Sequence, residues 1–354
     1  MNRIVFPPGN CTRQTVSLIR AVILAALATF PWVVPSWAIG PHTQTVDPTL
    51  DGVVRVLYDN PPQQNPGDGY FNGTGTIIGN HNVDGRGWLC VLTADHVLSS
   101  TGNFGGALVS RPGIAFSNSA QASGNSPYLD AGPRVRRNGA NGTSDLAVMG
   151  VRYGAFSPAY DALVRNVVPA TAFFFFSDIG YGDEGRLLNV DGMGGPDGYQ
   201  AQGVYGTERY LNDKIGTFQA NFSFIGYTYE AAHWFVENPA DPGAIQGSGT
   251  TFGADSGSPY FSSELMTDLN NDIFEFYTNN LFAVHTGPAA TQQFGGMPYK
   301  PFGFNNFGVA LTGADVEWIH ESCDYVVVPE PTTVVLIFVG IAAIALGRGR
   351  PMSR

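Results

Sequence analysis

The sequence predicts an all-β domain between about residues 39 and 326. The apolar residues of this stretch occur in short runs separated by glycine, proline, asparagine and aspartate, which is the punctuation of strands and turns. Glycine and proline are frequent, with 45 and 24 copies among 354 residues. No internal repeat of fixed period is present. Together these observations favour an antiparallel sandwich or barrel.

The clearest apolar runs predict five strands, which are 53–57, 75–78, 88–92, 146–149 and 281–284. Another run, Phe173 to Phe176, is most simply a buried strand. One helix is expected near the end of the domain. Thr312 and Asp315 form a cap-like start, and Val316, Trp318 and Ile319 supply an apolar face.

Charge is sparse and uneven along the chain. Only 13% of the residues are charged, against a usual share of about 25%. The net charge of −11 combines six arginines in two acid-free ends with a middle that holds 12 basic and all 29 acidic residues, a net charge of −17. Because the only lysines are Lys214 and Lys300, a nucleic-acid partner is not expected. The 44% apolar content argues against disorder, and three cysteines are too few for a disulfide scaffold.

The N-terminus has the pattern of a secretory signal peptide over residues 1–38. Arg13 and Arg20 precede the apolar run Ala21–Phe30, and small residues follow in Ser36-Trp-Ala38. A buried helix is the alternative interpretation. Cleavage after Ala38 would make Ile39 the new N-terminus.

The C-terminal residues 327–354 have three parts in order. Val328-Pro-Glu-Pro331 comes first, an apolar stretch from Val334 to Leu346 follows, and an arginine-containing tail ends the chain. The apolar stretch is marginal for spanning a bilayer of ~30 Å. This tail resembles the PEP-CTERM sorting signal of Gram-negative bacteria. The resemblance implies export, transient membrane anchoring by this segment, and removal of the segment by an exosortase-type enzyme at the cell envelope. A plain C-terminal anchor is the alternative.

Three segments carry residues suited to covalent catalysis. Ser256 lies in the glycine-rich turn 253–259, which can expose a hydroxyl and direct backbone N–H groups to one point. Among six histidines, His96 is the best placed base, because it follows the strand 88–92. Asp145 immediately precedes a buried strand, and an ionised buried aspartate needs a partner such as a histidine N–H.

In the order His96, Asp145, Ser256, these segments resemble the chymotrypsin-like serine peptidases. Leu92-Thr-Ala-Asp-His96, Ser144-Asp-Leu-Ala-Val148 and Asp255-Ser-Gly-Ser-Pro259 are similar to the family's three core motifs. The resemblance implies two six-stranded antiparallel β-barrels with a C-terminal helix. The first barrel is expected in 39–165, and the second barrel with the terminal helix in 166–323.

The resemblance implies an exported serine endopeptidase that acts through an acyl-enzyme on protein or peptide substrates, without cofactor or metal. Ser256 is the implied nucleophile, His96 the base and Asp145 the residue that orients it. The backbone N–H groups of Ala254 and Ser256 are the implied oxyanion hole. Ala254 replaces a usual glycine, and the alternative is a catalytically inactive homologue that acts as a surface-binding or matrix protein. Asp95 replaces a common alanine and has no sequence-based explanation.

In this family a freed N-terminal amine pairs with the aspartate before the serine, which implies a pairing of Ile39 with Asp255. Export itself would then activate the enzyme. An undirected N-terminus, with Asp255 paired elsewhere, is the alternative.

The expected substrate pocket consists of Thr251, His285, Thr286 and Gly287. A preference for basic residues is not expected, because Thr250 stands where trypsin-like enzymes carry an acid. Thr251 and His285 resemble the pocket pair of glutamyl endopeptidases, in which a histidine and a hydroxyl receive an acidic side chain. The alternative is a histidine satisfied by the backbone. Cys90 and Cys323 are expected to be two separate, mostly buried thiols.

Overall fold

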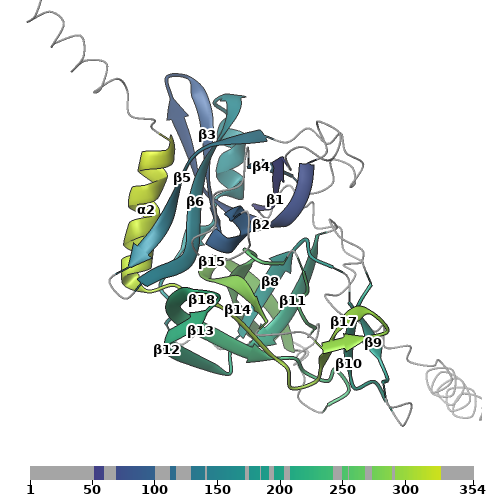
Figure 1. Cartoon of the computed structure of the whole chain (residues 1–354). Helices are drawn as coiled ribbons and strands as arrows, with labels where there is room; N and C mark the ends of the chain where they lie inside the picture. Colours follow the sequence, from purple (N-terminus) through teal and green to yellow (C-terminus); the bar gives the residue numbers. More distant parts are fainter. Residues whose placement is uncertain are drawn as a thin grey trace, which may run out of the picture. The chain divides into compact units, whose positions relative to one another are not determined.

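The structure is a computed structural model, and it describes thirteen segments of the chain. These are 52–59, 69–99, 112–116, 129–139, 142–171, 175–183, 185–190, 195–202, 208–241, 249–253, 255–267, 273–288 and 292–327. Within them most of the regular secondary structure is β-strand, with one α-helix at the C-terminal end (Figure 1). The predicted signal peptide, Ile39, Ala254 and the predicted C-terminal sorting segment from residue 328 onward lie outside the described residues.

The first barrel is a closed antiparallel ring of six strands. In ring order these are β1 (Val53–Asp59), β2 (Gly69–Val83), β3 (Arg86–Thr93), β6 (Gly142–Ala155), β5 (Leu129–Gly139) and β4 (Gly113–Ala115). Pairing of β1 with β4 closes the ring. Asp84 and Gly85, at φ 52° and 76°, connect β2 to β3. Two consecutive residues with positive φ form the tight turn whose twist suits a hairpin.

The strands of the second barrel also follow one another in an antiparallel ring. Its path is β11 (Arg209–Lys214), β8 (Phe175–Gly180), β14 (Pro259–Thr267), β15 (Ile273–Pro288), β18 (Asn305–Ala310), β13 (Tyr227–Phe235) and β12 (Thr217–Phe224). The two ends of this path, β11 and β12, are separated only by Ile215 and Gly216. Counted as one bent strand, β11 and β12 close a ring of six antiparallel strands. A short strand, β7 (Asn166–Val167), adds a parallel pairing to β15.

A small sheet outside the two barrels was not anticipated from the sequence. It contains β16 (Gln292–Phe294), β17 (Met297–Pro301), β10 (Gly198–Ala201) and β9 (Gly185–Leu188), in that order. Tyr199, Ala201, Val236 and Phe252 form a separate buried cluster beside it. Because Phe252 precedes the serine-bearing turn, this sheet supports one wall of the candidate site.

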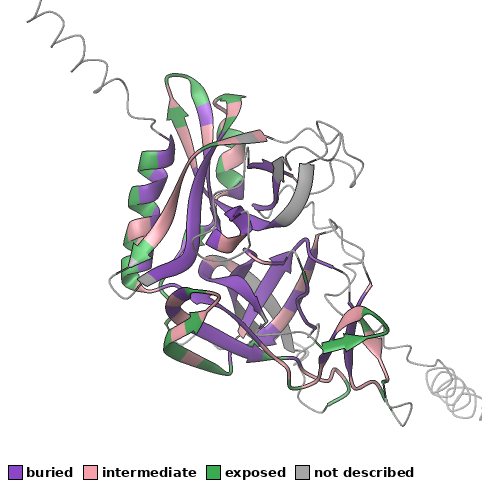
Figure 2. Cartoon of the chain, viewed as in Figure 1, coloured by how far each residue is buried: buried purple, intermediate pink, exposed green. Residues whose placement is uncertain are grey.

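One apolar cluster contains buried residues of both barrels, and a second cluster belongs to the second barrel alone. Buried residues dominate the strands where the barrels face each other (Figure 2). Ile77 and Val148 of the first barrel belong to the same buried cluster as Tyr227, Phe261 and Val309 of the second. Burial of this interface removes large apolar surfaces from water. The barrels are therefore packed into one unit, and residues from both can form a site between them.

The helix α2 (Gly313–Val327) begins at the predicted cap. The Asp315 N–H donates to Thr312 Oγ1 over 3.2 Å, and the Thr312 N–H donates to Asp315 Oδ2 over 3.0 Å. These reciprocal bonds form a capping box. The helix packs against β3, β5 and β6 of the first barrel (Figure 1). Arg137 of β5 pairs with Asp315 over 2.9 Å and stacks over the Trp318 ring.

The prediction of two separate thiols is wrong, because Cys90 and Cys323 form a disulfide. Cys90 lies in β3 and Cys323 in α2, at a sequence separation of 233. The pairing depends on the return of α2 to the first barrel, which residue spacing does not reveal. By closing so long a loop, the disulfide restricts the unfolded chain and contributes about 2–5 kcal/mol of stability.

The two antiparallel barrels and the C-terminal helix confirm the predicted all-β, chymotrypsin-like fold. All five of the predicted strands lie inside observed strands, which are β1 for 53–57, β2 for 75–78, β3 for 88–92, β6 for 146–149 and β15 for 281–284. In the part of the chain that the structure describes, no helix is both long and apolar enough to cross a membrane.

Candidate active site

His96 is presented by a short 3₁₀ helix, η2 (Asp95–Leu98), directly after β3. Asp95, Val97 and Leu98 of this turn are buried, whereas the side chain of His96 is 14% exposed. The buried neighbours anchor the turn in the first barrel and leave the imidazole at its surface, facing the second barrel.

Asp145 holds His96 at two points. Its Oδ2 lies 2.7 Å from His96 Nδ1, and its Oδ1 accepts the backbone N–H of His96 over 2.9 Å. Asp145 is fully buried in β6, so the carboxylate is shielded from water. This arrangement places the proton of a neutral imidazole on Nδ1 and leaves Nε2 as the free acceptor.

The pKa of His96 is raised. Burial is the largest single influence and lowers it, but the charge of Asp145, the hydrogen bond to Asp145 and the charge of Asp95 together outweigh burial. A basic imidazole beside a buried carboxylate is suited to take up a proton.

Ser256 lies in a tight turn held by both barrels. Its carbonyl accepts the N–H of Thr74 in β2 over 2.8 Å. The next N–H, of Gly257, donates to the backbone carbonyl of His285 in β15 over 2.8 Å. Gly257 has φ +88°, and a Cβ at this position would lie 2.1 Å from the carbonyl oxygen of Thr74. Glycine is therefore required here both for the turn and for the close approach of the first barrel.

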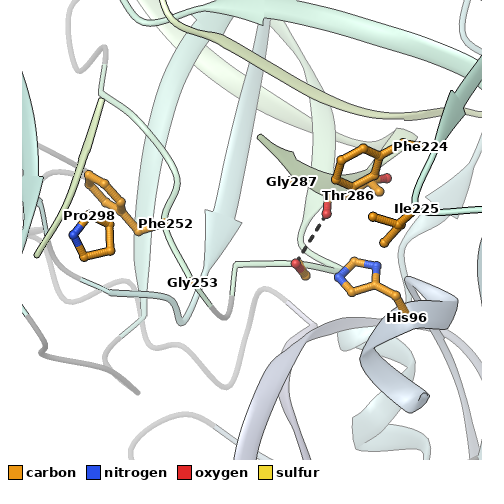
Figure 3. Close-up of a pocket in the computed structure, with 9 residues that line it drawn as sticks. His96, Phe224, Ile225, Phe252, Gly253, Thr286, Gly287 and Pro298 are labelled. Atoms are coloured by element: carbon orange, nitrogen blue, oxygen red, sulfur yellow. Dashed lines mark hydrogen bonds between the residues drawn. The ribbon is translucent and has the colours of Figure 1, made fainter. Parts of the chain in front are cut away.

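His96 and Ser256 line the same pocket, of about 310 Å³ (Figure 3). The remaining lining residues are Phe224, Ile225, Phe252, Gly253, Thr286, Gly287 and Pro298. Ser256 Oγ donates to the carbonyl of Thr286 over 3.4 Å, the dashed line of Figure 3. Among the described residues, no hydrogen bond joins Ser256 Oγ to His96 Nε2. Among the described residues, the Ser256 N–H has no hydrogen-bond acceptor. The N–H groups of its described neighbours Asp255 and Gly257 both donate to backbone carbonyls.

Asp255 is buried and accepts two backbone hydrogen bonds. Its Oδ1 takes the N–H of Gly182 over 2.7 Å, and its Oδ2 takes the N–H of Phe252 over 2.9 Å. Burial raises the pKa of Asp255 to about 6, against the opposing effect of these bonds and of Lys300 and Arg209. The predicted partner Ile39 lies outside the described residues, so its pairing with Asp255 stays a prediction.

The four predicted pocket residues separate into two pairs. Thr286 and Gly287 line the pocket, whereas Thr251 and His285 are buried beyond its lining. Within the described segments, the His285 side chain forms no hydrogen bond to the backbone. Its Nδ1 lies 2.6 Å from the Tyr260 hydroxyl, which also accepts the indole N–H of Trp234 over 2.9 Å.

This chain of hydrogen bonds holds the His285 ring in place. The Tyr260 hydroxyl accepts from Trp234 and can donate its own proton to His285 Nδ1, in which case the imidazole carries its proton on Nε2. Nε2 is buried and has no hydrogen-bond partner among the described residues. Burial, and then the charges of Lys300 and His96, hold the pKa of His285 well below its usual range, so the ring is neutral.

Lys300 is a functional candidate that sequence reasoning missed. Its side chain is fully buried, and Nζ donates to the carbonyl of Thr251 and, over 2.6 Å, to Oδ1 of Asn306. Nζ also lies 5.2 Å from the centre of the Phe252 ring, which lines the pocket. Burial lowers the pKa of Lys300 to about 7, although Asp255 and Asp178 oppose this shift. The available signal was its rarity, since the chain has only two lysines.

No group of three histidine, cysteine, aspartate or glutamate side chains within the described segments is arranged to hold a metal ion. The site as described consists of an aspartate–histidine pair from the first barrel and a hydroxyl from the second, with apolar and backbone groups around them.

Comparison with protein-family models finds no match, and comparison with curated proteins finds no similar sequence. Among solved structures, a Glu endopeptidase determined in complex with MPD is similar to this chain, with 14% sequence identity and a TM-score of 0.39. The similarity covers 78% of this chain and 91% of that protein. At this identity and score, neither residue roles nor a substrate transfer from that protein to this chain.

Proposed function

We propose that this protein hydrolyses peptide bonds by covalent catalysis, with Ser256 as nucleophile, His96 as general base and Asp145 as the residue that orients it. The observation that carries the proposal is the two-point grip of Asp145 on His96 in a pocket that Ser256 also lines. A carboxylate that fixes both the tautomer and the backbone of a histidine is an expected arrangement for a general base beside a hydroxyl nucleophile.

In the proposed reaction, Ser256 Oγ attacks the carbonyl carbon of the substrate while its proton moves to His96 Nε2. The C–N bond then breaks, and the leaving amine takes this proton from His96. Water attacks the resulting ester, again giving a proton to His96, and release of the acid returns the proton to Ser256 Oγ. Asp145 stabilises the imidazolium that forms in both halves.

Two features of the Ser256 turn support this sequence of steps. The 3.4 Å contact of Oγ with Thr286 is long and therefore weak, so little is lost when Oγ rotates about χ1 toward the His96 side of the pocket. The Ser256 N–H has no acceptor among the described residues, so it is available for the oxyanion of the tetrahedral intermediate, together with the proposed N–H of Ala254.

A fluorophosphonate probe tests the proposed chemistry directly. Wild-type protein and the Ser258→Ala variant are expected to be labelled, and Ser256→Ala is not. Ser258 is a matched control, because it lies in the same turn but is fully buried. Absence of labelling in folded wild-type protein, over a range of pH and N-terminal forms, would overturn the proposal in favour of an inactive homologue that acts by binding.

The same proposal includes a preference for substrates with an acidic side chain before the cleaved bond. Support comes from two buried groups. The Lys300 ammonium lies over the Phe252 ring, and Nε2 of His285 has no hydrogen-bond partner among the described residues. Thr251, the predicted pocket hydroxyl, lies 3.4 Å from Lys300 Nζ. A carboxylate that enters beside Thr251 would raise the pKa of Lys300 and restore its charge.

Peptides that differ only in Glu, Gln, Phe or Arg at this position test the preference. Glu is expected to exceed Gln by about tenfold or more in kcat/KM, as for a hydrogen bond to a charged group. Equal values for Glu and Gln, or equal values for wild type and His285→Ala on Glu peptides, contradict the acidic preference while leaving the peptidase chemistry intact.

We further propose that the protein is exported and processed at the cell envelope, with an exosortase-type enzyme as partner for its C-terminal segment. The Cys90–Cys323 disulfide supports export, because such bonds persist in oxidising compartments. Terminal sequencing and mass measurement of the protein isolated from its host test this. Intact residues at both ends would contradict it.

A further inference from the structure

Asp95, the residue immediately before His96, connects three elements through one buried carboxylate. Its Oδ1 accepts Nε of Arg136 over 2.6 Å, and its Oδ2 accepts the hydroxyl of Tyr227 over 2.8 Å. Arg136 lies in β5 of the first barrel, and Tyr227 begins β13 of the second. Asp95 and Tyr227 are both fully buried. The carboxylate therefore links the His96 turn to the opposite barrel.

This link has a counterpart on the other side of the site. The Thr74 N–H of the first barrel bonds the carbonyl of Ser256, while Asp95 of the first barrel bonds Tyr227 of the second. One connection is made at the nucleophile and the other at the residue next to the base. Two such connections oppose both translation and rotation of one barrel against the other at the site.

The carboxylate also adds a negative charge beside the base. A direct ion pair with Arg136 and a hydrogen bond from Tyr227 favour its ionised form, although burial, the largest influence, raises the pKa of Asp95. Burial and the charges of Asp95 and Asp145 raise the pKa of Tyr227, so its hydroxyl keeps its proton and remains the donor. The charge of Asp95 in turn raises the pKa of His96.

We propose that Asp95 is a positioning residue for His96, with a mechanical role through Tyr227 and an electrostatic role through its charge. The inference rests on the proposed function, in which His96 is the base. It also explains the aspartate at this position, since an alanine could form neither contact.

The electrostatic role has to be separated from the other groups around His96. The ionisable groups that act on this neighbourhood are Asp145 of β6, Arg134 and Arg136 of β5, Tyr227 and Tyr229 of β13, and His285 of β15. Asp145 dominates the rise in the pKa of His96, and Arg136 partly offsets Asp95. Removing Asp95 alone is therefore expected to give a modest shift.

Two substitutions separate the two roles. Asp95→Asn removes the charge, and we expect the pKa of His96 to fall by roughly 0.5 to 1 unit, which moves the acidic limb of kcat/KM to lower pH. Tyr227→Phe removes the link between the barrels but keeps the Asp95–Arg136 ion pair. We expect it to lower kcat about tenfold, as for a small misplacement of catalytic groups, with the acidic limb in place.

Titration of ¹⁵N-histidine resonances in the full-length protein, with His96→Gln for assignment, measures the pKa of His96 without reference to activity. Tyr153→Phe is the matched control, because it removes a partly buried hydroxyl bonded to Asn80 far from this link. If Asp95→Asn destabilises the protein through loss of the ion pair with Arg136, the double variant Asp95→Asn/Arg136→Gln replaces it. An unchanged His96 pKa in these variants, or equal kcat for Tyr227→Phe and Tyr153→Phe, overturns the inference. Failure of the proposed function differs, since wild type would then lack both probe labelling and hydrolysis while the titration remained readable.

Discussion

Asp145 in the first barrel and Asp178 in the second are both buried aspartates near the candidate site, yet their surroundings differ. Both oxygens of Asp145 hold His96. Neither oxygen of Asp178 has a hydrogen-bond partner among the described residues. Burial, and then the charge of Asp255, raise the pKa of Asp178 well above its usual range, with Lys300 and the nearby Ser258 hydroxyl opposing.

The same contrast extends to the neighbours of each aspartate. In the first barrel, burial raises the pKa of Asp95 as well, but its carboxylate forms an ion pair with Arg136 over 2.6 Å. In the second, burial shifts Asp255, His285 and Lys300 toward their neutral forms. The first barrel is therefore organised to hold fixed charge at the base. The second holds buried groups whose charge depends on pH and on what enters the pocket, because an unpaired charge in a dry interior is unfavourable.

The largest expected difference comes from the same substitution at the two aspartates. Asp145→Asn should lower kcat by about 10⁴-fold, because the amide favours the wrong histidine tautomer. Asp178→Asn replaces a neutral acid by a neutral amide of equal size and should leave kcat within a few-fold. Peptide hydrolysis by both variants, with thermal unfolding as a check on folding, measures this. A similar loss in both variants would break the contrast between the barrels.

The disulfide is a second feature that sets the first barrel apart, because it fixes α2 to β3. The double variant Cys90→Ser/Cys323→Ser should reduce the free energy of unfolding by about 2–5 kcal/mol, since the loop that it opens is long. Denaturant unfolding in oxidising and reducing buffer gives the value. The reduced wild type should match the variant, and an unfolding curve unaffected by reduction would contradict a contribution from this bond.

Substitution of Lys300 tests the proposal that the charge of buried groups around the second barrel depends on pH and on the substrate. Lys300→Met should lower kcat/KM for Glu peptides about 10- to 100-fold relative to Gln peptides, as for loss of a hydrogen bond to a charged group. In wild type the Glu preference should fall as the pH rises above about 7, where Lys300 loses its proton. Lys214→Met is the matched control, because this exposed lysine pairs with Glu237. Equal effects of both substitutions would remove Lys300 from the specificity site.

The lowered pKa of Lys300 also predicts how the free energy of unfolding changes with pH. Its pKa is lowered to about 7 in the folded protein from 10.5. Between these values the unfolded chain binds the proton and the folded chain does not, so this group increases the free energy of unfolding as the pH rises from 7 toward 10.5. Denaturant unfolding should show that rise in wild type and in Lys214→Met. Retention of the whole rise in Lys300→Met would assign it to other groups.

The smallest expected effect concerns the helix α2, which packs against the first barrel. Thr312→Ala removes the side chain that caps α2 and should reduce the free energy of unfolding by about 1 kcal/mol. Thr217→Ala, at an exposed strand end, should change it by less than about 0.5 kcal/mol. Chemical denaturation compares the two, and equal values would show that the capping box does not stabilise the helix.

Local sequence was sufficient to predict those elements that are stabilised by neighbouring residues in the chain. Apolar runs such as 88–92 became buried strands, and Thr312 with Asp315 became a helix cap, because both depend on neighbours in the chain. The candidate residues His96 and Asp145 could be named because each follows or precedes a recognisable strand. Their hydrogen bonds, however, join positions 49 residues apart and depend on the pairing of β3 with β6.

The features that the sequence did not predict depend on residues that lie far apart in the chain. The Cys90–Cys323 bond spans 233 residues and requires α2 to return to the first barrel. The burial of Lys300 arises from a small sheet that packs behind Phe252, and nothing in the residues around Lys300 indicates that sheet.

The sequence by itself determined an all-β domain, its terminal helix and a short list of residues able to perform covalent catalysis, because composition, periodicity and capping act over a few residues. Only the tertiary structure decided which groups meet. It paired Asp95 with Tyr227 across the barrels, held His285 by Tyr260, and buried Lys300 against Thr251. Such contacts depend on the packing of two closed barrels, and packing joins residues that the chain separates.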